Sequence, residues 1–255
     1  MEIRRTHSEE GSPGADTAES SPHRNNVIRL LSRGEIEIRE RLGRSSNATF
    51  RVVVHSGDAS LDAVYKPVSG ERPLWDFPRG LHRREAAAFE LSCHLGWAVV
   101  PETVVRHEAP LGEGSLQRWV DAEQNVDFFS LPPRGDTGRA LRLICAFDLV
   151  ANNADRKAGH VLWDRSGRVW AIDNALCFHP HPKLRTVIWD FAGEVLPPEV
   201  TSSLERLLKS GPPDALTQLL SRTELDLTME RAARLLDLGR FPHDPTGDHL
   251  PWPLV

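Results

Sequence analysis

Two aspartates stand where a fold could bring two carboxylates together for phosphoryl transfer. Asp155 lies in the polar stretch NNADRKAGHVL (152–162), directly after an apolar segment that ends at Ala151. Asp173 follows the apolar run VWAI and precedes Asn174. In phosphoryl transfer from ATP, one carboxylate accepts the proton of the attacking hydroxyl, and another holds the metal that bridges the phosphates. The pattern therefore predicts Asp155 as a catalytic residue and Asp173 as a metal ligand, although either alone could simply cap a turn or end a strand.

A lysine and a glutamate upstream could complete a site for the phosphates of ATP. Lys66 lies in the apolar run AVYKP, inside a segment with strand-like alternation. Glu85 is the first acid of the segment RREAAAFEL, which has a helical spacing of apolar residues. A strand lysine paired with a helix glutamate is how a kinase fold holds the α- and β-phosphates. A strand lysine is more often a surface residue, and Glu85 could instead pair with Arg83 or Arg84, so the prediction depends on all four residues occurring in this order.

A small polar turn between two strand-like segments is a further candidate for phosphate binding. The stretch LGRSSNATF (42–50) contains Ser45, Ser46 and Asn47. Backbone N–H groups in such a turn can cradle phosphate oxygens. Any hairpin turn uses the same residue types, and the stretch has neither the Walker A nor the G-x-G-x-x-G spacing. This turn is therefore weaker evidence than the lysine and the aspartates.

The elements that would position these residues can be located from the apolar periodicity. A short helix is expected at 26–31, strands at 35–42, 48–54, 61–67, 101–108 and 115–121, and one further helix at about 80–95. After the Pro/Gly-rich stretch LPPRGDTG, a long helix is expected at about 138–151, followed by a β-hairpin at 160–173 and mainly helical residues.

This order of elements predicts an α+β fold with two lobes. A small antiparallel β-rich N-lobe is expected at 26–122 and a mainly helical C-lobe at 123–244. The C-lobe would carry both the polar loop with Asp155 and the hairpin that ends at Asp173. Residues 1–25 are rich in Ser, Glu, Pro and Gly without apolar periodicity and are expected to be a disordered tail. Residues 245–255 are expected to be a C-terminal tail.

The bulk composition excludes several classes of function. The chain has 255 residues, of which 40% are hydrophobic and 26% are charged, an ordinary globular balance. Its formal net charge of −5 argues against a nucleic-acid binder, because such a protein needs a basic face. No stretch has the roughly 20 apolar residues that span a bilayer, and the polar N-terminal stretch lacks the apolar segment of a signal peptide. Cys93, Cys145 and Cys177 stand among apolar neighbours, as thiols of a reducing compartment do, so we expect a cytoplasmic protein.

The stretch DLVANNADRKAGHVLWDRSGRVWAIDNALCFHPHP (148–182) resembles the catalytic and metal-binding segments of the phosphatidylinositol 3-/4-kinase-like superfamily. AVYKP and REAAAFELSCHLGWAVVPETVV resemble the ATP-lysine strand and the following helix of the same superfamily. The likeness covers about residues 40–195 and is greatest to type II phosphatidylinositol 4-kinases and uncharacterised actinobacterial members. Its most specific part is the Asp-Arg pair at 155–156 together with the Ile-Asp pair at 172–173.

The resemblance implies a two-lobed protein-kinase-like fold and a kinase that transfers the γ-phosphate of ATP to an alcohol group. Its site residues correspond to the following positions: Lys66 for the phosphates, Glu85 as its partner, Asp155 and Arg156 in the catalytic loop, Asp173 for the metal, and Gln117, Trp119 and Val120 in the adenine-contacting hinge. The implied cofactors are ATP and Mg²⁺. The acceptor could be a small molecule, a lipid headgroup or a protein.

The sequence departs from that family pattern at two places. His160 stands where the superfamily usually has a second metal-binding residue, an asparagine, so it is a candidate metal ligand. Imidazole suits softer ions than Mg²⁺, so one metal position could be lost, be filled through water, or favour Mn²⁺. The segment after Asp173 offers only Lys183 and Arg185 as basic residues for an anionic headgroup. This scarcity weakens the assignment of a lipid substrate and leaves ATP binding unaffected.

A purely structural or interaction protein is one alternative to a kinase, but it would leave the kinase order of these four charged residues unexplained. Two alternatives that use a nucleotide also remain open from the sequence. A nucleotide-binding pseudokinase would bind ATP and signal through a change of shape, and an enzyme of the same fold could transfer AMP instead of phosphate. The sequence does not distinguish them, because specificity lies in loops whose position it does not define. The segment ERPLWDFP (71–78) has no assigned role, although a lid over the nucleotide is one hypothesis.

Overall fold

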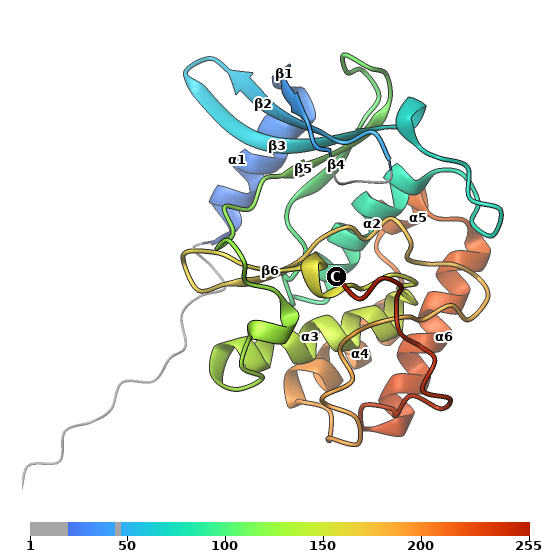
Figure 1. Ribbon diagram of the computed structural model, residues 1–255. Helices are drawn as coiled ribbons and strands as arrows, with labels where there is room; N and C mark the ends of the chain where they lie inside the picture. Colours follow the sequence, from blue (N-terminus) through green and yellow to red (C-terminus); the bar gives the residue numbers. More distant parts are fainter. Residues whose placement is uncertain (1–19, 44–46) are drawn as a thin grey trace, which may run out of the picture.

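The computed structural model describes residues 20–43 and 47–255, which form two lobes (Figure 1). The N-lobe contains α1 (Ser20–Arg33), β1 (Glu35–Arg41), β2 (Phe50–Ser56), β3 (Ala59–Pro67), α2 (Leu81–His94), β4 (Thr103–Arg106) and β5 (Gly114–Arg118). The C-lobe contains α3 (Gly135–Ala151), β6 (Val161–Trp163), β7 (Val169–Ala171), α4 (Pro198–Ser210), α5 (Asp214–Leu219) and α6 (Arg222–Leu238). Single turns of 3-10 helix occur at η1 (Val68–Gly70), η2 (Phe128–Ser130) and η3 (Ala158–His160). The predicted α+β, two-lobed plan is confirmed.

The N-lobe is built on a five-stranded antiparallel sheet with the order β1-β2-β3-β5-β4. Ala63 and Tyr65 of β3 belong to the core of this lobe, together with Leu116 of β5. Because side chains alternate between the two faces of a strand, Lys66 must point to the other face. That face lines a cleft between the lobes, and β3 is held on both sides by β2 and β5. Lys66 therefore projects into the cleft from a central strand.

Helix α1 begins earlier than the sequence predicts. Its apolar positions Val27 and Leu31 are buried against the sheet, and an i, i+4 pair of this kind places both on one face of the helix. Residues 20–25 are therefore helical instead of belonging to a disordered tail. Residues 1–19 of the predicted tail lie outside the described residues.

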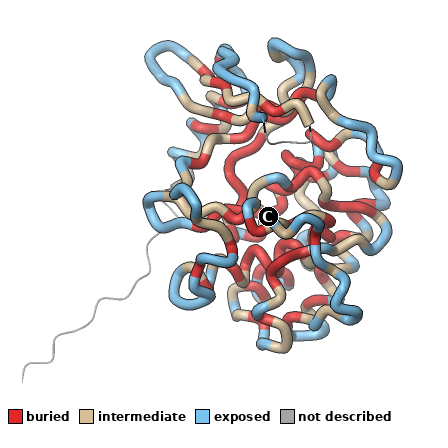
Figure 2. Tube along the Cα trace, viewed as in Figure 1, coloured by how far each residue is buried: buried red, intermediate tan, exposed pale blue. Residues whose placement is uncertain are grey.

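Helix α2 packs against both lobes. It contacts β4 and β5 in the N-lobe and α5 in the C-lobe, and Ala87 and Leu91 belong to the same core cluster as Phe147 of α3. Arg84 of α2 forms a buried ion pair with Glu224 of α6. Buried positions run through the middle of both lobes, and exposed positions gather at the loops (Figure 2). The helix that carries Glu85 is thus fixed to the helical lobe as well as to the sheet.

The last residues of the chain pack against the C-lobe beside the loop that follows α3. The backbone N–H of Ala158 donates to the carbonyl oxygen of Leu254 at 2.8 Å, and that of Thr186 donates to His249 at 3.0 Å. The C-terminus accordingly lies near the middle of the molecule in Figure 1. No helix in the described part of the chain is long and apolar enough to cross a membrane.

Candidate active site

A cleft of about 700 Å³ opens between the two lobes and collects most of the residues that the sequence singles out. Its walls include Asn47, Lys66, Glu85, Gln117, Trp119, Val120, Asp155, His160 and Asp173. Ser45 and Ser46 lie outside the described residues, so their predicted contact with phosphates stays a prediction. Arg156 does not line the cleft.

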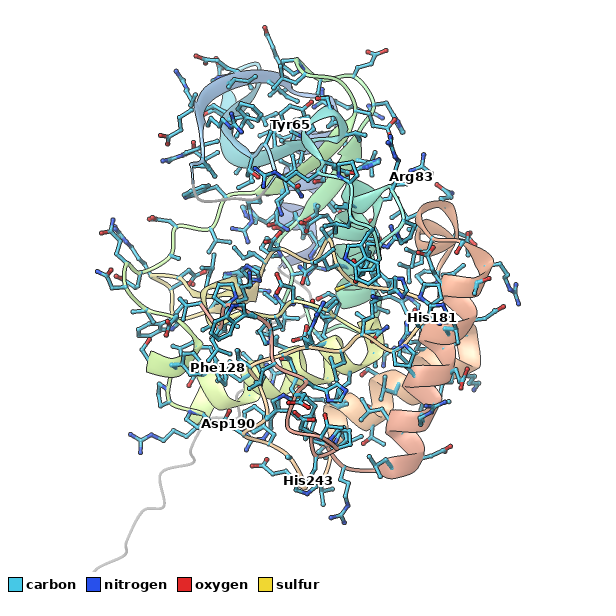
Figure 3. The ribbon with its side chains drawn as sticks, turned by 45° about the vertical axis from the view of Figure 1, so that its right-hand side comes forward. Tyr65, Arg83, Phe128, His181, Asp190 and His243 are labelled. Atoms are coloured by element: carbon cyan, nitrogen blue, oxygen red, sulfur yellow. The ribbon has the colours of Figure 1, made fainter. Side chains whose placement is uncertain are left out.

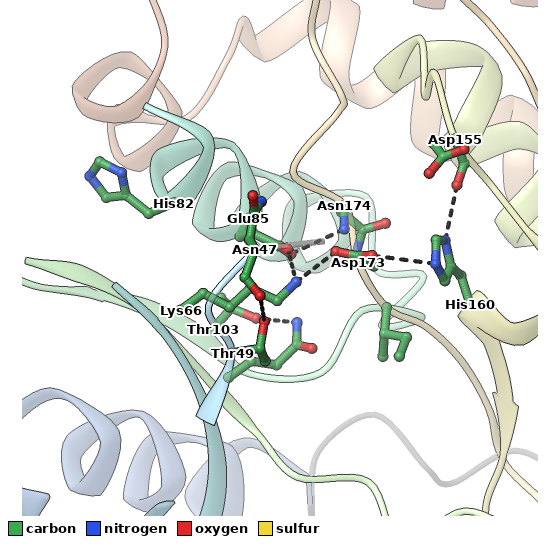
Figure 4. A network of polar contacts seen from close by, with 12 residues as sticks. Asn47, Thr49, Lys66, His82, Glu85, Thr103, Asp155, His160, Asp173 and Asn174 are labelled. Carbon is green, nitrogen blue, oxygen red and sulfur yellow. Dashed lines mark hydrogen bonds and ion pairs between the residues drawn. The ribbon is translucent and has the colours of Figure 1, made fainter. Parts of the chain in front are cut away.

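Lys66 contacts two carboxylates in the cleft, those of Glu85 and Asp173 (Figure 4). Its Nζ forms an ion pair with Glu85 Oε1 and lies 2.7 Å from Asp173 Oδ1. Burial alone would lower the pKa of this lysine, but the carboxylates of Asp173 and Glu85 reverse the effect and raise it above its ordinary value. Lys66 is therefore a permanent cation that links α2 to the end of β7.

Glu85 connects the same cluster to the backbone. Its side chain is only 2% exposed, and its second oxygen, Oε2, accepts a hydrogen bond from the N–H of Asn174 at 3.1 Å. The carboxylate thus binds Lys66 with one oxygen and the residue after Asp173 with the other. This geometry confirms that Glu85 and Lys66 are paired, and it excludes the alternative partners Arg83 and Arg84 for Glu85.

Asp173 adopts a backbone conformation that aims its carboxylate into the cleft. It lies two residues after the end of β7, and its φ of +57° lies in the left-handed region, which is uncommon for residues other than glycine but tolerated by Asp. Such local strain concentrates at functional sites. The Lys66 ammonium holds the pKa of Asp173 well below its usual range, so this carboxylate stays ionised. An ionised carboxylate is what a divalent metal requires.

Asp155 has a different environment from Asp173. It lies just after α3, where Asn152 ends the helix in the left-handed conformation, and its N–H donates to Asn153 Oδ1 at 3.0 Å. Burial raises the pKa of Asp155, while Lys157, whose Nζ is 3.3 Å from Asp155 Oδ2, partly opposes the shift. A carboxylate of raised pKa is better suited to accept a proton than one held strongly ionised.

His160 bridges the two aspartates. Its Nδ1 lies 2.9 Å from the carbonyl oxygen of Asp155, and its Nε2 lies 3.3 Å from Asp173 Oδ2. A carbonyl oxygen only accepts hydrogen bonds, so Nδ1 carries a hydrogen. Burial lowers the pKa of His160, which favours the neutral ring. In that form the lone pair of Nε2 faces the Asp173 carboxylate, an arrangement that a cation between the two would stabilise.

These donors fit a divalent metal that is shared with a nucleotide. Across residues 20–43 and 47–255, no group of three or more His, Cys, Asp or Glu side chains is placed to hold a metal ion. Nucleotide-bound Mg²⁺ usually takes only one or two protein carboxylates and completes its shell with phosphate oxygens and water. Asp173 and His160 could supply two ligands of such a shell. The nitrogen ligand would favour Mn²⁺ over Mg²⁺.

The prediction of Arg156 as a catalytic residue is wrong. Its side chain is fully buried and forms an ion pair with Asp148, which is also fully buried, at 3.0 Å. Its guanidinium also donates to the carbonyl oxygen of Ile172 at 2.6 Å and to Asn174 Oδ1 at 2.5 Å. Arg156 therefore holds the loop of Asp155 against the end of β7 without reaching the cleft. In this structure Arg156 is thus a residue that positions the loop of Asp155.

The predicted hinge residues line the cleft where β5 leaves the N-lobe. Gln117, Trp119 and Val120 are all part of its wall. Gln117 is 8% exposed and donates to Thr103 Oγ1 at 2.8 Å, and Trp119 stacks under the guanidinium of Arg51 at 4.6 Å. These contacts fix the positions of Gln117 and Trp119 in the wall of the cleft.

Lys157, Glu71 and His82 are among the charged or titratable residues of the cleft that the sequence did not single out. Lys157 follows Asp155 by two positions, and that spacing was the available signal. Glu71 and His82 line the cleft too, with His82 Nδ1 3.3 Å from Glu71 Oε1 and His82 Nε2 2.8 Å from Glu113 Oε1. The sequence gives no signal for this cluster, because Glu71 and Glu113 lie in loops without a motif and only the fold brings them to His82.

Comparison with known proteins places the chain in a family. No family model matches it. It is 38% identical to Protein Rv2133c of Mycobacterium tuberculosis (strain ATCC 25618 / H37Rv) over 262 aligned residues, which cover 88% of this chain and 94% of that protein. The chain belongs to the Rv2133c family. The comparison defines this family without assigning it a chemistry.

Solved structures connect the fold of this Rv2133c-family protein to kinases. The Golgi casein kinase with Mn/ADP bound matches at a TM-score of 0.56 and 14% identity, over 85% of this chain and 75% of that one. Hydra Fam20 with sugar matches at a TM-score of 0.55 and 16% identity, over 87% of this chain and 89% of that one. The Rv2133c-family chain therefore has a two-lobed protein-kinase-like fold. At these identities the likeness shows the fold alone.

Proposed function

We propose that this protein is an ATP-dependent phosphotransferase, a kinase that moves the γ-phosphate of ATP to a hydroxyl acceptor. The observation that carries the proposal is Lys66, which joins Glu85 and Asp173 inside the cleft while Asp155 lies across from it. Phosphoryl transfer needs a cation for the phosphates, a strongly ionised carboxylate for a metal, and a second carboxylate that can accept a proton, for which a raised pKa is suited. A purely structural protein has no use for three such groups in one cleft.

We further propose that the protein is a member of the phosphatidylinositol 3-/4-kinase-like superfamily. The similarity of AVYKP and of the stretch 148–182 to that superfamily supports this assignment, and the kinase-like fold is consistent with it. The solved Golgi casein kinase has Mn and ADP bound, which supports the use of a nucleotide and a divalent metal by this fold. The identity of the acceptor does not follow from either likeness.

In the proposed reaction, the acceptor hydroxyl gives its proton to Asp155 as its oxygen attacks the γ-phosphorus. The bond between that phosphorus and the oxygen bridging to the β-phosphate breaks, and ADP leaves with the electron pair of that bond. Lys66 lies where it can bind the phosphates and offset the charge that they carry in the transition state. Asp173 and His160 would hold the divalent metal, which when bound neutralises charge on the phosphates. Arg156 and Glu85 hold the loop of Asp155 and the segment after β7 in position.

Two labels on ATP test the proposed reaction against its alternatives. The protein is incubated with Mn²⁺ or Mg²⁺ and ATP labelled in the γ- or the α-phosphate, beside Asp155→Asn as the inactive control. Transfer of the γ label to water or to an added alcohol, lost in Asp155→Asn, supports a kinase. Transfer of the α label means that AMP is moved. Binding of ATP without movement of either label identifies a pseudokinase and contradicts the proposal.

A further inference from the structure

His82 is buried between two carboxylates at the start of α2, and the proposed reaction uses none of the three groups. Its side chain is only 5% exposed, with Nδ1 3.3 Å from Glu71 Oε1 and Nε2 2.8 Å from Glu113 Oε1. Both His82 and Glu71 line the nucleotide cleft. Because Glu71 begins the segment ERPLWDFP (71–78), the hypothesis of a lid there stays a prediction. The cluster therefore borders the place where ATP would bind.

The two carboxylates determine the charge of the His82 ring. Burial opposes the ionisation of Glu71, but hydrogen bonds from His82 outweigh it and hold the pKa of Glu71 below its ordinary value. Hydrogen bonds from His107 and His82 likewise lower the pKa of Glu113. An ionised carboxylate only accepts hydrogen bonds, so each nitrogen of the His82 ring must donate one. A neutral imidazole has one N–H and an imidazolium has two, so this geometry requires the imidazolium.

Glu71 also caps the helix that carries Glu85. The residue before α2, Gly80, has no side chain that could accept from the first N–H groups of the helix. Glu71 Oε1 takes this role, since it accepts from the backbone N–H of His82 at 3.0 Å. The helix dipole further stabilises an anion at this end. Glu85 follows His82 by three residues, which places both on one face of the helix (Figure 4).

The segment around Glu71 is bonded to the polar turn that contains Asn47. The N–H of Ala48 donates to the carbonyl oxygen of Gly70 at 3.1 Å, and the N–H of Arg72 donates to Asn47 Oδ1 at 3.0 Å. Asn47 itself lines the cleft, in the turn that is the candidate for phosphate binding. A displacement of Glu71 would therefore displace this turn as well.

Glu113 anchors the other side of the His82 ring to the sheet. Its carbonyl oxygen accepts from the N–H of Val68, the residue after β3, at 2.7 Å. Two further side chains approach its carboxylate: Nδ1 of His107 lies 2.9 Å from Oε2, and a guanidinium nitrogen of Arg83 lies 4.0 Å from Oε1. Both are exposed, and Arg83 is labelled on this flank of the N-lobe in Figure 3. Water screens exposed pairs, so the buried His82 ring makes the stronger interaction.

We propose that His82, as an imidazolium, is a positioning residue that ties the turn of Asn47 to the Lys66–Glu85 pair. It acts through Glu71 and needs no contact with the nucleotide. This inference rests on the proposed kinase function, because it gives His82 a role in the same cleft.

The expected consequence of losing the His82 charge falls on ATP binding. The carboxylates of Glu71 and Glu113 would be left without their shared buried cation, and Glu71 would add negative charge to the wall of the cleft. That charge repels the phosphates of ATP. Proton transfer to Asp155 does not involve His82, so KM for ATP should change more than kcat.

Steady-state ATP turnover by the full chain with Mn²⁺ is measured for wild type, His82→Gln and Glu71→Gln/His82→Gln. The matched control is His55→Gln, since His55 also faces a glutamate, Glu37, but outside the cleft. We expect His82→Gln to raise KM for ATP about tenfold, the scale of losing a hydrogen bond between charged groups. The double variant removes the unpaired carboxylate and should recover part of the loss. His55→Gln should match wild type.

Nitrogen NMR of the wild-type chain at pH 7 tests the charge of the ring without any variant. We expect both nitrogens of the His82 ring, assigned from its backbone, to carry a proton. A ring with a single N–H, or a His82→Gln protein with the KM of wild type, overturns the inference and leaves the kinase function intact. A less stable His82→Gln protein with unchanged KM would show a purely structural role and overturns it too. Wild type that binds ATP without turnover contradicts the kinase function itself, on which the inference rests.

Discussion

Lys66 and Asp173 are 107 residues apart in the sequence, yet Lys66 Nζ lies 2.7 Å from Asp173 Oδ1. The contact joins the central strand of the N-lobe to the segment after β7 in the C-lobe, inside the cleft. Glu85 holds the same ammonium from α2. In the empty cleft, the Lys66 ammonium is therefore already paired with two carboxylates. When a nucleotide and its metal bind, we expect the Asp173 carboxylate to bind the metal.

Lys66→Met should remove phosphate binding and lower the free energy of unfolding, because it leaves the buried carboxylate of Glu85 without its cation. We expect ATP turnover to fall by about a hundredfold or more, the scale for losing one preorganised charge at a transition state. The change also removes the main cause of the lowered pKa of Asp173. Steady-state ATP turnover checks the prediction, and Lys209→Met, an exposed lysine in the last turn of α4, is the matched control. Equal losses in both variants would contradict the role of Lys66.

Asp155→Asn should abolish transfer and leave ATP binding in place. It should also make the protein as stable as wild type at neutral pH or more stable. Burial raises the folded-state pKa of Asp155 above the unfolded value, so its ionised form costs stability above that pKa. Thermal unfolding of both proteins at pH 7 checks the effect on stability, and nucleotide-dependent shifts of the midpoint check ATP binding. A marked loss of stability would show that Asp155 serves the fold.

The raised pKa of Asp155 also predicts the pH dependence of the rate. A base must be ionised to accept a proton, so kcat/KM should fall as the pH drops through the folded pKa of Asp155. Because that pKa is raised, the fall should begin at a higher pH than for an ordinary aspartate. A rate that stays flat down to the ordinary aspartate range would argue against Asp155 as the base.

The sequence predicted the strand that carries Lys66, the helix that carries Glu85 and the loop of Asp155 because each depends on local periodicity. Alternation along β3 and helical spacing along α2 are properties of neighbouring residues. The early start of α1 escaped prediction because residues 20–25 carry no apolar stripe of their own. Their helix is continuous with the turn that buries Val27 and Leu31.

The role of Arg156 could not be predicted, because it depends on a partner in another element. Asp148 lies on α3. Only the folded chain shows that its carboxylate accepts hydrogen bonds from the Arg156 guanidinium, which therefore does not reach the cleft. The cluster around His82 and the approach of Trp75 to Lys183 are similarly long-range. Each joins segments that the sequence alone does not bring together.

Arg156→Met should destabilise the protein severely. It leaves the carboxylate of Asp148 buried without its cation, and breaking a buried pair in this way costs roughly 3–5 kcal/mol. Denaturant unfolding of Arg156→Met measures the loss, and Asp148→Asn/Arg156→Met, which removes both charges, should recover part of it. A stable Arg156→Met protein that lacked only activity would restore the catalytic interpretation of Arg156.

His160→Asn should change the metal preference. The amide oxygen of asparagine replaces a nitrogen ligand, and Mg²⁺ prefers oxygen ligands. We expect wild type to bind ATP more tightly with Mn²⁺ than with Mg²⁺ and the variant to narrow or reverse that difference. Nitrogen coupling in the electron paramagnetic resonance of bound Mn²⁺ supplies a readout that is independent of turnover. If the coupling is absent in wild type, His160 is not a ligand.

The central claim is that the cleft around Lys66 and Asp173 binds ATP with a divalent metal. Thermal unfolding of the full chain with and without ATP, in Mn²⁺ and then Mg²⁺, beside Asp173→Asn, tests it most directly. A ligand that binds only the folded state at about 100 times its Kd stabilises that state by about 2.7 kcal/mol. We predict a metal-dependent rise of the midpoint that Asp173→Asn abolishes. No rise at millimolar ATP with either metal would contradict the claim.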